Sequence, residues 1–257
     1  MSRAPRLAVF ALLGLCALLP CWAVRAQDPL ATLDDDGDDD SAERRAELTR
    51  VLAQARSYLT DGATDPARLE LAERACANAA RLDARSGDVE LLWAQVMSAR
   101  GDVAGAIRHA ERAATLSPRS FDAQLLHASL LLDIRDARHA KAAYERALAL
   151  RESSYEARLG LALALRRAGD SSAAAEQLRR CTRDAPRRAE AFYELGVTLS
   201  ASATAPEASE GRAAYARFLT LAGSEPRFAD AVRAARAGQT PRPAPTRWAP
   251  RSVTRRH

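Results

Sequence analysis

The side chains best suited to chemistry are the histidines, and their arrangement does not favour catalysis. His109, His127 and His139 are predicted to lie on different helical faces, without the spacing of zinc ligands. His127 falls at a core-facing position, where we expect a buried histidine with satisfied hydrogen bonds. No glycine-rich phosphate loop and no Ser/His/Asp arrangement is apparent. The sequence therefore predicts a protein that is not an enzyme, with no catalytic residue, no metal site and no cofactor.

A run of aspartates from Asp34 to Asp40, followed by Glu43, has a spacing that resembles a calcium loop. Thr32 stands where the first aspartate ligand of such a loop would be, and Pro29 leaves no room for a complete preceding helix. We therefore interpret residues 27–41 as a solvated, disordered acidic linker, and calcium binding stays open.

Residues 1–26 carry the three parts of a secretory signal peptide. Arg3 and Arg6 precede an apolar stretch from Leu7 to Leu19, and Val24-Arg25-Ala26 ends in a small residue. We expect cleavage near Ala26 and Gln27 and a periplasmic or secreted location. The alternative is an uncleaved N-terminal membrane anchor from Leu7 to Val24.

The rest of the chain is rich in helix formers. Alanine, leucine and arginine dominate, and only 5% of the residues are aromatic. Small alanines recur at a spacing of 34 residues, at Ala72, Ala106, Ala140 and Ala174. Two further columns keep the same step: Cys76, Ala110, Tyr144 and Leu178, then Ala79, Ala113, Ala147 and Cys181. A period of this length indicates a repeat protein in which each unit packs on the next.

The repeat resembles the tetratricopeptide repeat (TPR), a helix-turn-helix unit. In residues 87–120, Trp93-Ala94 lies on the first helix, Gly101-Asp102 forms the turn, Ala106 lies on the second helix and Pro118 closes the unit. The resemblance implies an all-α, right-handed α-α superhelix (solenoid) of about five repeats with a C-terminal capping helix. The domains expected are a signal peptide, the acidic linker, a solenoid over 42–237 and a disordered basic tail over 238–257. Within the solenoid the expected units are residues 42–86, 87–120, 121–154, 155–188 and 189–224, with the cap at 227–237.

The repeat register also predicts local features. Gly101 and Gly169 are expected to take the left-handed conformation that ends a helix, and Arg135 should make the most strained turn of the three. Cys76 and Cys181, three repeats apart, are expected to be buried packing residues and not a disulfide.

In a TPR stack the first helix of each repeat lines a concave groove that binds peptides. By that resemblance the partner-binding residues in this chain are Leu91, Gln95, Leu125, Ser129, Leu159, Leu163, Tyr193 and Val197. A row of leucines there would be an exposed apolar patch; the alternative is that the leucines help to form the core. The carboxylate clamp of chaperone-binding TPR proteins is not found in these rows.

An acid stands near the start of each of these first helices. These acids could cap the helices and interact with the helix dipole, or form an acidic rim that selects a basic partner; they are Asp88, Asp122, Glu156 and Glu190.

The tail from Gly238 to His257 holds arginines and no acid. Its possible contacts to an anionic surface are Arg242, Arg247, Trp248, Arg251, Arg255 and Arg256. We expect no uniform basic surface on the folded part and therefore no nucleic-acid partner.

Together these features predict a non-catalytic scaffold or adaptor, exported across the inner membrane, that binds a protein or peptide partner in the concave groove. The alternative is an envelope-surface-associating protein whose basic tail binds anionic lipid or cell-wall polymer. The sequence leaves the oligomeric state open.

Overall fold

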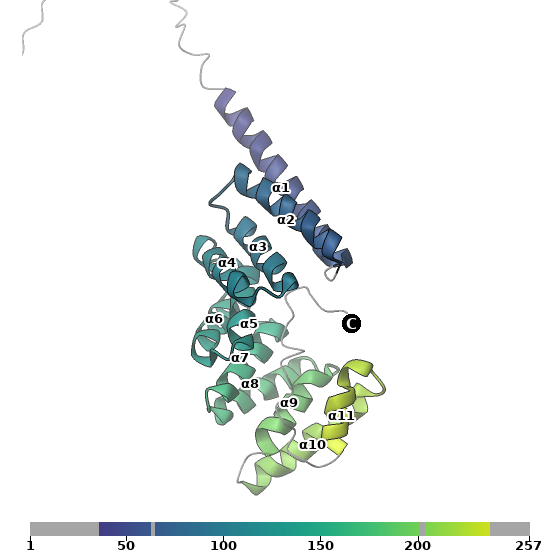
Figure 1. The fold of residues 1–257 in the computed structure, drawn as a ribbon. Helices are drawn as coiled ribbons and strands as arrows, with labels where there is room; N and C mark the ends of the chain where they lie inside the picture. Colours follow the sequence, from purple (N-terminus) through teal and green to yellow (C-terminus); the bar gives the residue numbers. More distant parts are fainter. Residues whose placement is uncertain (1–35, 63–64, 201–203, 237–257) are drawn as a thin grey trace, which may run out of the picture. The chain divides into compact units, whose positions relative to one another are not determined.

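The computed structural model describes residues 36–62, 65–200 and 204–236, and within these ranges the chain is helical, with no strand (Figure 1). The chain divides into two units, Met1–Ser41 and Ala42–His257. The second unit contains α1 from Ala42 onwards and all the later helices. The all-α fold class predicted from the sequence is confirmed.

The helices form five consecutive pairs and a short C-terminal element. Their bounds are α1 Asp36–Gly62, α2 Pro66–Leu82, α3 Gly87–Arg100, α4 Val103–Leu116, α5 Phe121–Asp133, α6 Ala137–Leu150, α7 Tyr155–Arg167, α8 Ser171–Asp184, α9 Ala189–Ser200, α10 Ala205–Ala222, the 3-10 turn η1 Pro226–Phe228 and α11 Ala229–Arg236.

Helix starts are set by two columns of capping side chains that repeat every 34 residues. Serines cap the first helices α3, α5 and α7: the hydroxyls of Ser86, Ser120 and Ser154 accept from backbone N–H groups three residues on. Aspartates cap the second helices α4, α6 and α8 in the same way, at Asp102, Asp136 and Asp170. Each such cap is worth about 1 kcal/mol. The repeated caps give the three pairs α3/α4, α5/α6 and α7/α8 the same register.

The turns inside the middle pairs each contain one residue with positive φ. Gly101 has φ 83° and Gly169 has φ 90°, while Arg135 has φ 65°. A side chain in this region of φ costs of order 1 kcal/mol, which glycine avoids. The prediction that Arg135 makes the strained turn is therefore confirmed.

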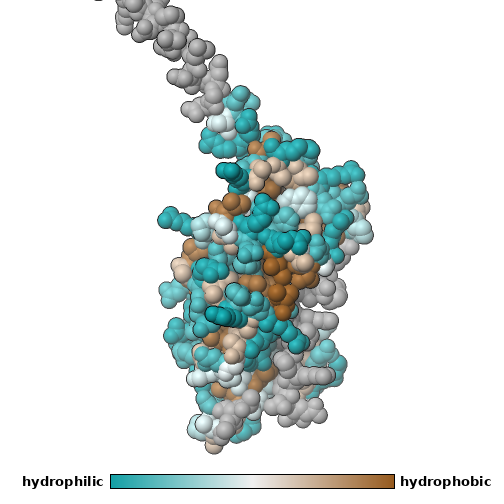
Figure 2. All heavy atoms as spheres, turned by 60° about the vertical axis from the view of Figure 1, so that its left-hand side comes forward, coloured by the Kyte–Doolittle hydropathy of each residue, from teal (hydrophilic) through white to brown (hydrophobic). Residues whose placement is uncertain are grey.

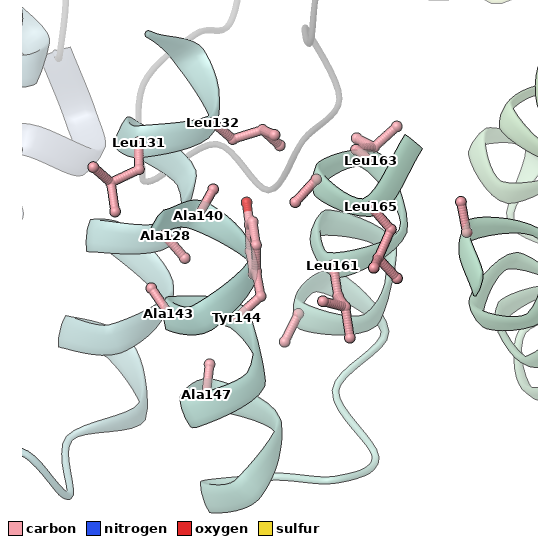
Figure 3. Packing of buried hydrophobic residues seen from close by; sticks show 13 residues of the cluster. Ala128, Leu131, Leu132, Ala140, Ala143, Tyr144, Ala147, Leu161, Leu163 and Leu165 are labelled. Atoms are coloured by element: carbon pink, nitrogen blue, oxygen red, sulfur yellow. The ribbon is translucent and has the colours of Figure 1, made fainter. Parts of the chain in front are cut away.

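The core runs continuously between neighbouring pairs and is built largely from alanine. The alanines at Ala72, Ala106, Ala140 and Ala174 are fully buried. They let helices approach closely, and larger side chains fill the spaces between pairs, such as Tyr144 (Figure 3) and Leu178. Cys76 and Cys181 are buried free thiols, as predicted.

One expectation about the N-terminal part is wrong. Helix α1 begins at Asp36, so residues 36–41 are helical and do not belong to a linker. Aspartates in the first turn of a helix interact favourably with the positive end of its dipole, so an acidic run can begin a helix. The signal peptide and the rest of the linker lie outside the described residues.

Candidate partner-binding face

The first helices of the repeats form one layer. Helix α3 contacts α5, α5 contacts α7, and α7 contacts α9. The eight residues predicted to line the groove occupy two positions, four residues apart, on each of these helices, so they share one stripe per helix. We call this set the inner rows: Leu91, Gln95, Leu125, Ser129, Leu159, Leu163, Tyr193 and Val197.

Most of the inner rows are buried. Leu91 is 6% exposed, Leu159 1%, Leu163 2%, Tyr193 1% and Ser129 4%. The prediction of an exposed row of leucines is therefore wrong. These side chains pack in clusters shared by first and second helices: Leu163 joins the cluster that contains Tyr144 of α6, and Leu159 joins the cluster that contains Leu178 of α8. The alternative, that the leucines belong to the core, describes them better.

Three members of the inner rows remain accessible. Gln95, Leu125 and Val197 are half-buried, on α3, α5 and α9. Leu125 packs only partly against the core cluster that contains Tyr144. A partner on this face would meet these three side chains first.

The four acids at the helix starts differ along the stack. Asp88 and Asp122 are exposed, and no ion pair to them is found among the described residues. Glu156 pairs with Arg188 at 2.6 Å, and Glu190 pairs with Arg227 at 3.0 Å. Burial raises the pKa of Glu156, but the hydrogen bonds from Arg188, its own backbone N–H and Ser154, together with the charge of Arg188, outweigh burial and lower the pKa overall. Serines cap α3 and α5, so Asp88 and Asp122 are left to interact with the helix dipole or with a partner.

Charge is divided between the two helices of the repeats. The first helices α3, α5, α7 and α9 carry seven acids and four bases. The second helices α4, α6, α8 and α10 carry six acids and ten bases. The layer that holds the inner rows is therefore the more acidic one, although Glu90, Glu156, Glu190 and Glu194 are paired within the chain.

A buried ion pair, which sequence reasoning missed, joins two first helices. Arg166 of α7 donates from Nη2 to Glu194 Oε2 of α9 at 2.6 Å, and Glu194 is 2% exposed. Arg166 Nε is also buried, but no acceptor for it exists in the part of the chain that the structure describes. The two residues are 28 positions apart in the sequence, so no short-range pattern predicts the contact. Only the alignment of one repeat on the next could have suggested it.

Two tyrosines from second helices each lie against a glycine of a first helix. A Cβ on Gly160 of α7 would overlap the ring of Tyr144 from α6, and a Cβ on Gly196 of α9 would lie 2.7 Å from the ring of Tyr215 from α10. Tyr144 is fully buried, and its hydroxyl has no hydrogen-bond partner among the described residues. Burial raises the pKa of Tyr144 far above its ordinary value. The Tyr215 hydroxyl lies 3.4 Å from Ser200 Oγ.

Comparison with known proteins gives a consistent picture of the fold. No family model and no curated protein matches the sequence. Among solved structures, YrrB, described as a TPR protein with an unusual peptide-binding site, has a TM-score of 0.56 and 20% identity, over 66% of this chain and 84% of its own. PilF of Pseudomonas aeruginosa has a TM-score of 0.62 and 16% identity, over 76% and 90%. MamA has a TM-score of 0.55 and 19% identity, over 60% and 89%.

The chain has the TPR fold. At these identities the likeness concerns the arrangement of the helices alone.

The histidines of this TPR stack are structural. His109 Nδ1 lies 2.6 Å from Glu90 Oε2, and its ring stacks on Trp93 with centroids 5.7 Å apart. His139 Nδ1 lies 2.7 Å from Asp136. His127 is half-buried, and its Nδ1 has no partner in the described ranges, so the expectation of a satisfied histidine is wrong. Burial lowers the pKa of His127. Within the described residues no group of these side chains is placed to hold a metal.

Exposed large apolar side chains of the TPR stack lie away from the inner rows. They lie on second helices and in turns, at Leu71, Val103, Leu116, Ile134 and Leu150. Figure 2 shows, for one face of the molecule, apolar residues set among hydrophilic ones. In the part of the chain that is described, no helix is long and apolar enough to cross a membrane. The six predicted contacts in the tail, from Arg242 to Arg256, lie outside the described residues.

Proposed function

We propose that this chain is a non-catalytic scaffold that binds a polypeptide segment on the layer of first helices. The observation that carries the proposal is the direct packing of α3 on α5, α5 on α7 and α7 on α9, which places the first helices of four repeats side by side. An extended segment of about ten residues is roughly 30 Å long, and four helices at 8–10 Å spacing present a face of that length.

The accessible side chains of this face define what such a partner would contact. Gln95, Leu125 and Val197 offer one amide and two apolar groups, and Asp88 and Asp122 add exposed carboxylates. The buried members of the inner rows shape the face beneath these groups. A partner segment with apolar residues and positive charge fits this surface best. The likeness to YrrB, a TPR protein with a peptide-binding site, is consistent with such a role.

The test is a peptide selection followed by mapping. A displayed library of random 12-residue peptides is selected on the wild-type chain, and the best binder is synthesised with a fluorescent label. A photo-crosslinking amino acid is then placed at Leu125 on α5 or, as matched control, at Leu116 on α4. The peptide is expected to crosslink from position 125 and not from position 116. Circular dichroism checks that both variants are folded. Crosslinking from 116 alone, or failure of any peptide to bind, would overturn the proposal.

We also propose that the protein is exported, on the strength of the signal-like residues 1–26. Expression in a bacterial host, followed by N-terminal sequencing of the periplasmic fraction, is expected to find a chain that begins near Gln27. A chain that stays in the cytoplasm with Met1 intact contradicts export, and an uncleaved chain in the membrane fraction indicates the anchor instead.

A second candidate function rests on the composition of the tail. Residues 238–257 carry five arginines and Trp248 without an acid, which suits an anionic lipid or cell-wall surface. Binding to vesicles that contain phosphatidylglycerol should then depend on the tail and be lost when it is deleted. If binding to the selected peptide survives the deletion, the two functions reside in different parts of the chain.

A further inference from the structure

The C-terminal cap of the stack is attached to α9, the last of the first helices. Ala231 of α11 belongs to the same core cluster as Tyr193 of α9. Arg227 of η1 donates to Glu190 at the start of α9, at 3.0 Å. Figure 1 shows the cap next to α9 and α10. The chain therefore continues into residues 237–257 from the α9 end of the layer of first helices.

The tail, residues 238–257, has the composition that suits this layer. It contains five arginines and no acid, and Arg247, Trp248 and Arg251 stand in its middle. The partner proposed for the layer is a segment with apolar residues and positive charge. A segment of that kind is thus part of the chain itself.

The tail is long enough to reach the far end of the layer. Arg247 and Arg251 stand 11 and 15 residues after Arg236, the last residue of α11. Chains of these lengths reach up to about 36 Å and about 50 Å. Neighbouring first helices are about 8–10 Å apart, so α5 is about 16–20 Å and α3 about 24–30 Å from α9. Both arginines can therefore reach α5 and α3 without a fully extended path.

The carboxylates that an arginine could meet lie on those two helices. Asp88 of α3 and Asp122 of α5 are exposed, and neither has an ion pair in the described part of the chain. Asp122 is three residues before Leu125, and Asp88 is seven residues before Gln95, so each acid shares a helix face with an accessible member of the inner rows. Each of the two helices thus presents a negative charge together with an apolar or amide group.

Helix α7, between α5 and α9, presents a closed surface. Every residue from Ala157 to Leu165 is buried. A segment that passes over α7 touches this surface and does not have to enter it. The specific contacts therefore fall on α5 and α3.

We propose that the middle of the tail, residues 242–251, lies across the first helices of its own chain. Its arginines pair with Asp88 and Asp122, and Trp248 packs on Leu125. The tail then covers the face on which a partner binds, and the partner has to displace it. This inference rests on the proposed function, since it makes the tail an internal competitor for the same face.

A weak contact is enough for such competition, because the tail is attached to the chain. Its effective concentration at the face is on the order of 1 mM. With a Kd of about 0.2 mM for the separate tail, the face is covered in about five molecules of six, and the Kd of a partner rises about sixfold. The ion pairs are exposed, so salt should weaken the competition.

The first test uses the full chain without any peptide. A photo-crosslinking amino acid replaces Leu125 on α5 or, as matched control, Leu116 on α4. Digestion and mass spectrometry are expected to find position 125 linked to residues 242–251 of the same chain, and position 116 not linked to them. The absence of this link, links only between two chains, or an equal yield from position 116 overturns the inference.

The second test measures competition with the labelled peptide selected on the wild type. Deletion of residues 238–257 is expected to lower its Kd threefold to tenfold in about 50 mM salt, measured by fluorescence anisotropy, and less than twofold in about 500 mM salt. Equal Kd values in low salt, with and without the tail, overturn the inference while the proposed function stands. If no peptide binds either chain, the proposed function fails, and the contact of the tail is decided by the crosslink and by the next test.

The third test adds the tail as a separate labelled peptide to the chain that lacks it. Asp88→Asn with Asp122→Asn is expected to weaken this binding at least threefold. The matched control is Glu111→Gln with Asp184→Asn, which removes two exposed acids from the second helices α4 and α8 and should bind like the unchanged chain. Circular dichroism checks that both double variants are folded. An equal loss in both, or a loss in neither, overturns the proposed pairing.

Discussion

At two junctions between a second helix and a first helix of this TPR stack, a tyrosine ring packs against a glycine, but the surroundings of the two hydroxyl groups differ. At one, the ring of Tyr144 fills the space left by Gly160; at the other, the ring of Tyr215 fills the space left by Gly196. Tyr144 is fully buried among alanines and leucines, and its hydroxyl is unpaired within the described chain. Tyr215 is half-buried beside Tyr193, with ring centroids 6.1 Å apart, and its hydroxyl lies near Ser200.

The difference shows that two requirements are independent at such a junction: a glycine that leaves room for the ring, and a hydrogen-bond partner for the hydroxyl. Both glycines admit an aromatic ring between a second helix and a first helix. Only the C-terminal junction also provides a neighbour for the hydroxyl, because Ser200 ends α9 beside Tyr215. Phenylalanine would fill the Tyr144 site without the unpaired oxygen. The hydroxyl at that site therefore adds no hydrogen bond within the described residues.

The largest expected effect comes from removing each ring. Tyr144→Ala leaves a cavity in the centre of a core cluster and should lower the free energy of unfolding by about 3–5 kcal/mol. Tyr215→Ala should cost about half as much, because the ring is already partly in solvent and Phe218 remains packed on Tyr193 at 5.0 Å. Urea unfolding followed by circular dichroism measures both. Equal losses would show that the two junctions contribute alike.

The next effect comes from filling the glycine sites. Gly160→Ala places a methyl group on the rigid Tyr144 ring and should destabilise by about 2–3 kcal/mol, despite the better helix propensity of alanine. Gly196→Ala should cost about 1 kcal/mol or less, because the half-exposed Tyr215 ring can move outward. The same unfolding experiment compares them, with Gly101→Ala, which has positive φ and no close neighbour, as a control for backbone strain alone. A neutral Gly160→Ala would contradict the close approach of Tyr144.

Alkaline pH should separate the two tyrosines further. Burial raises the pKa of Tyr144 well above its ordinary range and raises the pKa of Tyr215 to about 12. An unfolded tyrosine ionises near pH 10, so the unfolded state loses its proton first and stability falls as pH rises above about 10. For the fully buried Tyr144 the slope approaches about 1.4 kcal/mol per pH unit.

Between pH 10 and 11, the free energy of unfolding of Tyr144→Phe should therefore fall less than that of wild type. Below pH 9, the variant and wild type should show the same pH dependence. Tyr215→Phe should show a slightly smaller gain, which grows from about pH 10 and stops growing near pH 12, where Tyr215 also ionises in the folded state. Urea midpoints at four pH values measure this. Identical slopes in Tyr144→Phe and wild type would mean that the Tyr144 hydroxyl is accessible in the folded state.

The smallest effect is the change from tyrosine to phenylalanine at neutral pH, where the two sites should differ in sign. Tyr144→Phe removes an unpaired hydroxyl and should leave stability unchanged or raise it by up to about 1 kcal/mol. Tyr215→Phe removes the contact with Ser200, which is long at 3.4 Å, and should lower stability by about 0.5 kcal/mol. Loss of stability in both variants would indicate that the Tyr144 hydroxyl has a partner after all.

The sequence predicts the helix pairs of this stack but not all of their polar contacts. The 34-residue period located the helix pairs because it combines helix propensity, small packing residues and turn residues in one register. The serine and aspartate caps were not recognised, although Ser86, Ser120 and Ser154 keep the same step of 34 and could have been found in that way. Tyr144 stands in a column with Cys76, Ala110 and Leu178, and nothing in that column indicates an unpaired hydroxyl.

The error over the leucines has a geometric cause. Leu91, Leu159 and Leu163 occupy the predicted positions on their helices, but the packing of neighbouring first and second helices decides whether those positions face solvent or the core. That packing depends on how side chains from several repeats fit together. Short-range patterns contain no information about it. The half-buried Leu125 shows that the exposure changes from one repeat to the next.

By itself the sequence determined the helices, their turns and their order, because the signals for these lie within a few residues of one another and recur at one period. It also determined that Arg135 would hold a left-handed turn, since glycine stands at the equivalent position in the neighbouring repeats. Only the tertiary structure decided which inner residues are covered, which acids are paired, and which donors lack acceptors. Those properties depend on atoms that are 20 to 40 residues apart in the chain, as with Glu156 and Arg188, and they exist only once the repeats are packed.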